Sequence, residues 1–116
     1  MKYLALLFST LAPLCAAAEP PVIVAVEAHQ GANGWQFDVT LAHPDTGWAH
    51  YADAWEVLDA EGNSLGIRRL LHPHVDEQPF TRALGNVAVP AGTERVFIRA
   101  RCLVDGWGGA LFEVTL

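Results

Sequence analysis

The sequence predicts an all-β domain, and three observations support that prediction. From residue 19 onward, apolar and polar residues alternate with a period of two, which places them on opposite faces of extended segments. Turn-forming residues, chiefly Gly, Pro, Asn and Asp, separate these segments at short intervals. No stretch shows the 3.6-residue period expected of a helix of three turns. Seven short strands with such spacing predict an antiparallel sandwich of the immunoglobulin or fibronectin type III kind, with a small barrel as the alternative.

The first two strands form a predicted hairpin. The strand at residues 22–29 carries three valines on one face: Val22, Val24 and Val26. The Gly-Ala-Asn-Gly sequence of residues 31–34 then turns the chain. In residues 35–41 large apolar residues alternate with Gln, Asp and Thr, as expected of a strand with one buried face.

The middle of the chain supplies two more strands and two loops. Residues 43–51 are rich in turn formers and precede a third strand around residues 55–57. A turn at residues 59–63 leads into a fourth strand at residues 65–71. Residues 72–79 contain two prolines, which cannot donate to a sheet ladder, so this segment is predicted to be a connecting loop.

Three strands complete the predicted domain. They are expected at residues 80–89, 96–102 and 112–116, with turns at 90–93 and 105–109 between them. In the sandwich topology the third, fourth, sixth and seventh strands share a sheet. The outward face of that sheet would carry five charged residues: Glu56, Arg68, Arg99, Arg101 and Glu113. Facing opposite charges contribute about 0.2–1 kcal/mol per pair, so we expect an ion-pair ladder, with an anion-binding patch as the alternative.

The N-terminal residues have the pattern of a secretory signal. Lys2 precedes an uncharged, Leu- and Ala-rich run at residues 3–18, which ends in three alanines. The run is shorter than the roughly 20 residues that a membrane-spanning helix needs. We therefore expect residues 1–18 to be a cleaved signal peptide and residues 19–116 to form one β-sandwich domain, periplasmic or secreted. Lipidation of Cys15 is the alternative, but bulky Leu14 precedes it where such sites carry a small residue.

Charge and cysteine content exclude several classes of function. The 116 residues carry a formal net charge of −6, which disfavours nucleic acid and anionic membranes as partners. Signal cleavage would leave Cys102 as the one remaining cysteine, so no internal disulfide is expected. Because Cys102 alternates with apolar residues, we interpret it as a buried thiol.

No Ser, Cys or Lys nucleophile is paired with a base, and the protein is not expected to be an enzyme.

Four of the five histidines fall in the two loops at residues 43–51 and 72–79. In the second loop a proline holds the backbone extended between two histidines, and a glutamate follows closely. Imidazoles and carboxylates are donors suited to Zn²⁺ or Cu²⁺. The predicted metal ligands are His50, His72, His74 and Glu77. A purely structural loop is the alternative, because exposed histidines bind metal loosely unless a third ligand and outer hydrogen bonds hold them.

Three segments resemble an uncharacterised family of short exported proteobacterial proteins. They are W-A-H-Y-A-D at residues 48–53, L-G-I-R-R-L-L-H-P-H-V-D-E-Q-P-F-T-R at 65–82 and G-W-G-G at 106–109. The central segment contains the motif H-P-H-x-x-E-Q-P-F-T-R and is the most specific of the three. The resemblance implies an exported single-domain protein and brings no activity with it.

The expected function is that of an exported binding module that holds Zn or Cu through the histidine loop. The main alternative is a structural or protein-interaction module without metal, which would contact an envelope protein through its Trp-bearing loops or a sheet edge. A small metal-dependent hydrolase is a third hypothesis, with Glu77 as general base beside a metal-bound water.

Overall fold

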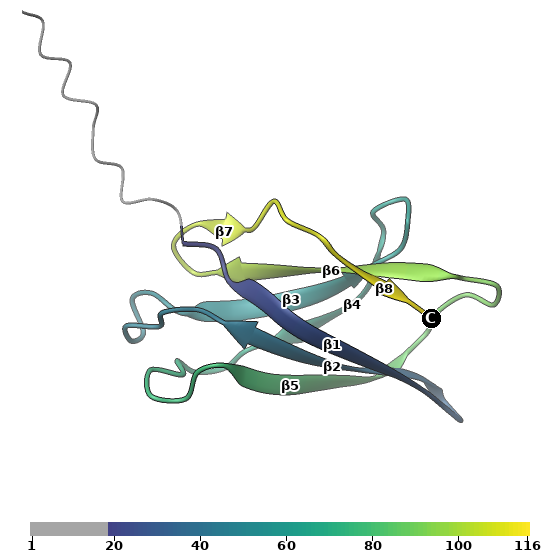
Figure 1. The fold of residues 1–116 in the computed structure, drawn as a ribbon, viewed down its shortest axis with the longest axis horizontal. Helices are drawn as coiled ribbons and strands as arrows, with labels where there is room; N and C mark the ends of the chain where they lie inside the picture. Colours follow the sequence, from purple (N-terminus) through teal and green to yellow (C-terminus); the bar gives the residue numbers. More distant parts are fainter. Residues whose placement is uncertain (1–18) are drawn as a thin grey trace, which may run out of the picture.

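The computed structural model describes residues 19–116, and the predicted signal peptide at residues 1–18 lies outside the described part. The described residues form eight β-strands and no helix, so nothing in them forms a helix long and apolar enough to cross a membrane. The strands make two antiparallel sheets that face each other (Figure 1). Their bounds are β1 Val22–Gly31, β2 Gly34–Ala42, β3 Ala52–Leu58, β4 Ser64–Arg69, β5 Phe80–Val87, β6 Arg95–Cys102, β7 Gly106–Trp107 and β8 Phe112–Thr115.

The strand order agrees with the sheet predicted from the sequence. One sheet has the order β1-β2-β5, and the other has the order β4-β3-β6-β7, with β8 also paired to β6. The third, fourth, sixth and last strands therefore share a sheet, as expected. The structure adds a strand, because β7 pairs for two residues with Arg101 and Cys102, where the sequence predicted only a turn at residues 105–109.

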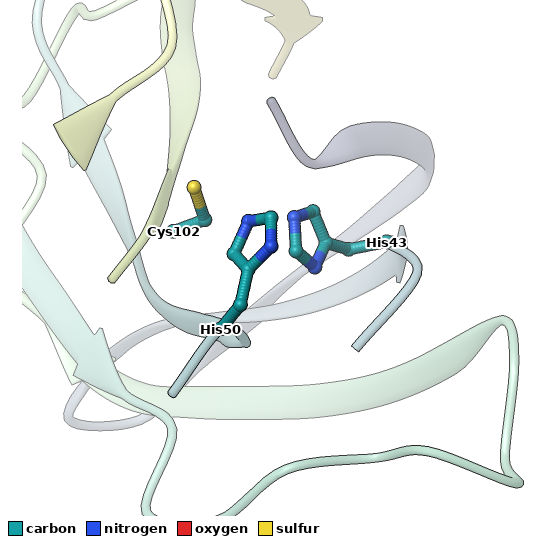
Figure 2. A group of neighbouring side chains, drawn as sticks. All are labelled: His43, His50 and Cys102. Atoms are coloured by element: carbon teal, nitrogen blue, oxygen red, sulfur yellow. The ribbon is translucent and has the colours of Figure 1, made fainter. Parts of the chain in front are cut away.

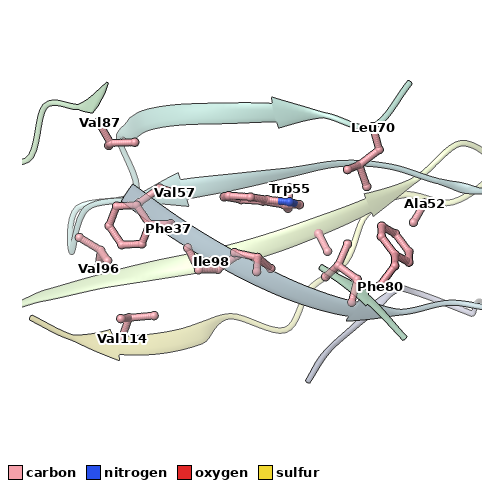
Figure 3. Close-up of a cluster of buried hydrophobic side chains, with 13 residues drawn as sticks. Phe37, Ala52, Trp55, Val57, Leu70, Phe80, Val87, Val96, Ile98 and Val114 are labelled. Atoms are coloured by element: carbon pink, nitrogen blue, oxygen red, sulfur yellow. The ribbon is translucent and has the colours of Figure 1, made fainter. Parts of the chain in front are cut away.

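The core lies between the two sheets and draws on both (Figure 3). Alternation in β2 buries Phe37, Val39 and Leu41 completely, and Trp55 of β3 faces them with no exposed surface. Phe80, the first residue of β5, is also buried. Burying a large apolar side chain contributes about 1.5–3 kcal/mol relative to leaving it in water, so this cluster is the main source of cohesion between the sheets.

The predicted face of β1 is wrong in part. Val22 and Val24 are 60% and 50% exposed, whereas Ile23 and Val26 pack against the core. The pairing register of β1 with β2 shifts between Ile23 and Ala25. An extra residue at such a bulge inverts which face the following side chains occupy, and a strict two-residue alternation does not foresee it.

The outward face of the larger sheet carries the expected ion pairs. Three pairs span neighbouring strands or segments: Arg99 with Glu56 at 2.6 Å, Arg101 with Asp53 at 2.7 Å and Arg95 with Glu113 at 3.3 Å. Arg68 instead donates to the backbone carbonyl of Arg69. The Arg99 guanidinium also lies 4.2 Å from the ring centre of Trp107. Charges on this face are thus largely satisfied within the chain.

Three loops gather at one end of the molecule, on the left in Figure 1. They are the loops at residues 43–51, 70–79 and 103–105, which connect β2 to β3, β4 to β5 and β6 to β7. Leu103 donates its backbone N–H to the carbonyl of Tyr51 at 2.9 Å, which ties the first loop to the third. Both histidine-bearing loops therefore lie at the same end.

Candidate metal centre

His43, His50 and Cys102 come together at the loop end of the sandwich (Figure 2). His43 directly follows β2, His50 lies just before β3, and Cys102 is the last residue of β6. One nitrogen from each imidazole and the Cys102 sulfur all lie within 4.8 Å of one another. The cluster thus brings His43, which follows the smaller sheet, next to His50 and Cys102, which border the larger sheet.

His43 is held by a buried carboxylate. Its Nδ1 lies 2.6 Å from Oδ1 of Asp45, and neither side chain has exposed surface. The same carboxylate accepts the backbone N–H groups of Ala52 at 2.9 Å and His74 at 2.8 Å. Because the carboxylate accepts the Nδ1 proton, the free lone pair of the neutral ring lies on Nε2. That nitrogen is buried and has no hydrogen-bond partner.

A tight turn sets the position of His50. Its backbone N–H donates to Gly47 at 3.1 Å, and its carbonyl accepts from Thr46 at 3.0 Å. Gly47 has a φ of 143°, a conformation that residues with a Cβ rarely adopt. The His50 ring stands edge-on to His43, with ring centres 4.8 Å apart, and its Nε2 is also buried without a partner.

The third member, Cys102, is fully buried, as the sequence predicted. The backbone N–H of Asp105 donates to its sulfur at 3.3 Å, and the thiol lies 3.5 Å from the carboxylate of the same residue. Burial raises the pKa of the Cys102 thiol. The sulfur therefore carries a proton that a bound metal ion would displace.

The donor set suits a transition metal. Two imidazole nitrogens and one thiolate are ligands for zinc and copper. Metal–ligand bonds of about 2.0–2.3 Å would draw the three donors to about 3.3–3.8 Å from one another, a modest contraction of the cluster. A buried nitrogen without a hydrogen-bond partner lowers the stability of the fold by about 1–3 kcal/mol. A single cation would bind both unpaired nitrogens, Nε2 of His43 and Nε2 of His50. The Asp45–His43 contact has the form of the carboxylate–histidine pairs that orient metal ligands.

The H-P-H loop has a different arrangement from the predicted ligand set. The His72 and His74 rings are close, at 4.5 Å between centres, but His74 stacks on Phe80 and its Nε2 lies 2.8 Å from Arg82. A guanidinium only donates, so this nitrogen accepts and its lone pair is engaged. Within residues 19–116, no group of three or more metal-capable atoms within 4.8 Å of one another includes His72, His74 or Glu77. Of the four predicted ligands, the structure brings only His50 into such a group, and metal binding by the H-P-H loop stays a prediction.

The loop at residues 70–79, which contains the H-P-H motif, is hydrogen-bonded to the loop that carries His43 and His50. Gln78 accepts the backbone N–H of His43 at 3.0 Å and donates to the carbonyl of His74 at 2.8 Å. Together with the bond from His74 to Asp45, this fixes the two histidine-bearing loops against each other. The sequence left their proximity open, and the structure shows that they are joined by hydrogen bonds from the backbone of each loop to the side chains of Gln78 and Asp45.

A second group of metal-capable atoms lies on the outer face of β1 and β2. His29 is 3.7 Å from Glu27 and 3.3 Å from Asp38. The His29 side chain is 58% exposed. An exposed group of this kind has no buried unpaired nitrogen to favour a metal, unlike the His43–His50–Cys102 cluster.

Fold and site define a small two-sheet β protein with a His₂Cys cluster in which His43 and Cys102 are buried and His50 is partly buried. Among curated proteins, the chain is similar to a "Putative lipoprotein" of Halomicrobium mukohataei, with 43% identity over 84 residues. The match covers 72% of this chain and 41% of the relative, so the chain spans less than half of the relative's length. The relative is archaeal, and the proteobacterial origin of the resembling family stays a prediction. No protein-family profile and no solved structure matches the chain.

Proposed function

We propose that this protein is an exported module that binds a transition-metal ion, Zn²⁺ or Cu²⁺, through His43, His50 and Cys102. The observation that carries the proposal is the pair of buried Nε2 atoms, each without a hydrogen-bond partner, beside a buried thiol. The described residues contain six buried side-chain atoms without a partner, and the presence of two of them in one cluster of metal-capable residues supports a bound ligand there.

Asp45 gives the proposal independent support. A carboxylate that holds Nδ1 of a histidine fixes the ring orientation and makes Nε2 a better electron donor. The same carboxylate accepts two backbone N–H groups, so its own position is fixed by the fold. These contacts supply His43 with the outer hydrogen bonds that a histidine ligand needs, and the sequence alone did not reveal them.

Export and fold type belong to the same proposal. The signal-like residues 1–18 and a relative whose printed name is a lipoprotein both favour export, with the periplasm as the expected compartment. The strand order, with β3, β4, β6 and β8 in one sheet, favours the immunoglobulin-like type of sandwich. We propose binding rather than catalysis, because the His43 and Cys102 side chains are buried and only His50 is partly exposed, which leaves little room for a substrate beside a bound ion.

Native mass spectrometry tests this proposal directly. The purified protein is incubated with Zn²⁺ or Cu²⁺, and we expect one ion per chain. Cys102→Ser and His50→Ala should each weaken uptake by about 100-fold or more, because each removes one of only three donors. His72→Ala is the matched control, since this histidine is exposed and outside the cluster.

Two results would count against the proposal. Equal uptake by the native protein and by the Cys102→Ser and His50→Ala variants would place the ion elsewhere. Loss of uptake in His72→Ala alone would return the site to the H-P-H loop. Circular dichroism of each variant establishes that it keeps the β fold before its metal content is compared.

A further inference from the structure

We infer that the centre selects copper, and that the Cys102 thiolate binds Cu²⁺ directly. This inference rests on the proposed function and specifies its metal. Structural zinc sites use four protein ligands, commonly with two or more thiolates. Within the described residues the cluster offers three donors, of which one is sulfur. Two imidazoles and one thiolate are instead the ligand set of copper centres with a short copper–sulfur bond.

The composition of the chain strengthens the argument. Residues 19–116 contain Cys102 as their one cysteine and no methionine, so they have no second sulfur ligand to offer. Sites with the same donors bind Cu²⁺ more tightly than Zn²⁺, because affinity across the first-row metals peaks at copper. A structural zinc site would need a tetrahedral fourth ligand from the protein, and among the described residues the cluster offers only three donors.

Burial of Cys102 also makes a Cu²⁺–thiolate bond durable. Free Cu²⁺ destroys exposed thiols: two thiolates lose one electron each and form a disulfide, while two Cu²⁺ ions are reduced to Cu⁺. Cys102 has no exposed surface, so two chains cannot bring their sulfurs together while folded. The backbone N–H of Asp105 donates to the sulfur at 3.3 Å and can keep this bond to a metal-bound thiolate, whereas the Asp105 carboxylate at 3.5 Å favours the protonated thiol until a cation is bound.

The cluster is also held in place by contacts outside it. His43 is fixed by Asp45, His50 by its turn with Gly47, and Cys102 by the pairing of β6 with β3 and β7. Such outer contacts orient the ligands of a metal site, and the hydrogen bonds around the sulfur tune copper sites with a short copper–sulfur bond.

Visible absorption during a Cu²⁺ titration tests the inference. The full purified protein should develop an intense sulfur-to-copper charge-transfer band that saturates at one equivalent. Cys102→Ser should lose the band, and His29→Gln, in the exposed second group, should keep it at full intensity. In about a tenfold excess of Zn²⁺, copper should still occupy most of the protein, as the order of metal affinities requires.

The possible results distinguish failure of the copper assignment from failure of the metal-binding proposal. Zn²⁺ bound at the cluster as tightly as Cu²⁺, with no charge-transfer band, would overturn the copper assignment and leave the metal-binding proposal intact. A band that persists in Cys102→Ser would also overturn it. Absence of any bound metal would overturn both. If Cys102→Ser fails to fold, His50→Gln replaces it, because the partly exposed His50 tolerates substitution and should still lose or shift the band.

Discussion

Asp45 is the residue on which the candidate site most depends. Its two carboxylate oxygens accept three donors, from His43, Ala52 and His74, and all of these contacts are buried. The side chain therefore orients a proposed ligand and fastens the two histidine-bearing loops at the same time. Asparagine, the neutral residue of the same shape, cannot accept all three of these hydrogen bonds.

Asp45→Asn should impair both duties. The amide keeps one acceptor oxygen and turns the other into an NH₂ group, which leaves at least one buried donor unpaired. We expect the free energy of unfolding of the metal-free protein to fall by about 1–3 kcal/mol. The dissociation constant for the metal should rise about 10- to 100-fold. Urea denaturation and metal competition measure the two effects. Exposed Asp76→Asn is the control, and equal behaviour of the two variants would contradict the assigned role.

His74 should make the fold sensitive to mild acid. Burial, followed by the nearby Arg82 and His72, lowers the pKa of His74 below its usual value of 6.5, and the weaker opposing effects of Glu77 and Asp45 do not reverse this. The unfolded chain thus binds the proton at a higher pH than the folded chain does. The free energy of unfolding therefore keeps its full value above about pH 6.5 and decreases as the pH falls from there through the lowered pKa of His74.

Urea denaturation in chelator across this pH range measures the His74 contribution. The free energy of unfolding of His74→Gln should decline less steeply with falling pH than that of the native protein. His29→Gln, at an exposed position, should follow the native profile. Parallel profiles for the native protein and His74→Gln would show that His74 contributes nothing to the acid sensitivity.

At the scale of the element, strands with one face on the core were the most predictable. Phe37, Val39 and Leu41 in β2 alternate cleanly because one side of that strand is fully buried. The face of β1 was not predictable, because a bulge of one residue leaves no mark on the composition of the strand.

The candidate centre was only partly predictable for a related reason. Cys102 alternates with Val96 and Ile98, a pattern that fits a core residue and says nothing of its neighbours at the strand end. His43 and Cys102 meet because β2 and β6 end at the same end of the sandwich. The available signal was positional: His43 and Cys102 lie close to the ends of predicted strands, and His50 lies in the predicted loop that begins at His43.

The hairpin between β1 and β2 depends on Gly34. Its φ is 129°, and a Cβ at this position would lie 2.7 Å from the backbone oxygen of Val87. Gly34→Ala should therefore lower the free energy of unfolding by about 1–3 kcal/mol. Gly85→Ala is the matched control, because a Cβ there meets nothing within 4 Å, and it should change stability by less than about 1 kcal/mol. Thermal or urea unfolding compares the two variants, and equal losses would contradict the strain at Gly34.

At the scale of the molecule, the proposed metal connects the two sheets. His43 follows β2 of the smaller sheet, whereas His50 and Cys102 border β3 and β6 of the larger one. With one cysteine in residues 19–116, a disulfide cannot connect the sheets, and a metal bridge would take that place. An ion bound only by the folded state stabilises it in proportion to the logarithm of its concentration.

Thermal unfolding measures this link between metal and fold. With free Cu²⁺ at about 100 times its dissociation constant, the folded state should gain about 2.7 kcal/mol, and Tm should rise accordingly. His72→Ala should show the same rise and Cys102→Ser none. A rise of equal size in Cys102→Ser would mean that the ion stabilises the protein from another site.

Anomalous X-ray diffraction from crystals grown with Cu²⁺, collected at the copper absorption edge, locates the ion most directly. The expected result is one strong peak enclosed by His43, His50 and Cys102, at about 2.0–2.3 Å from two nitrogens and the sulfur. A peak at His72 and His74, or at the exposed group around His29, with none at the buried cluster, would contradict the central claim.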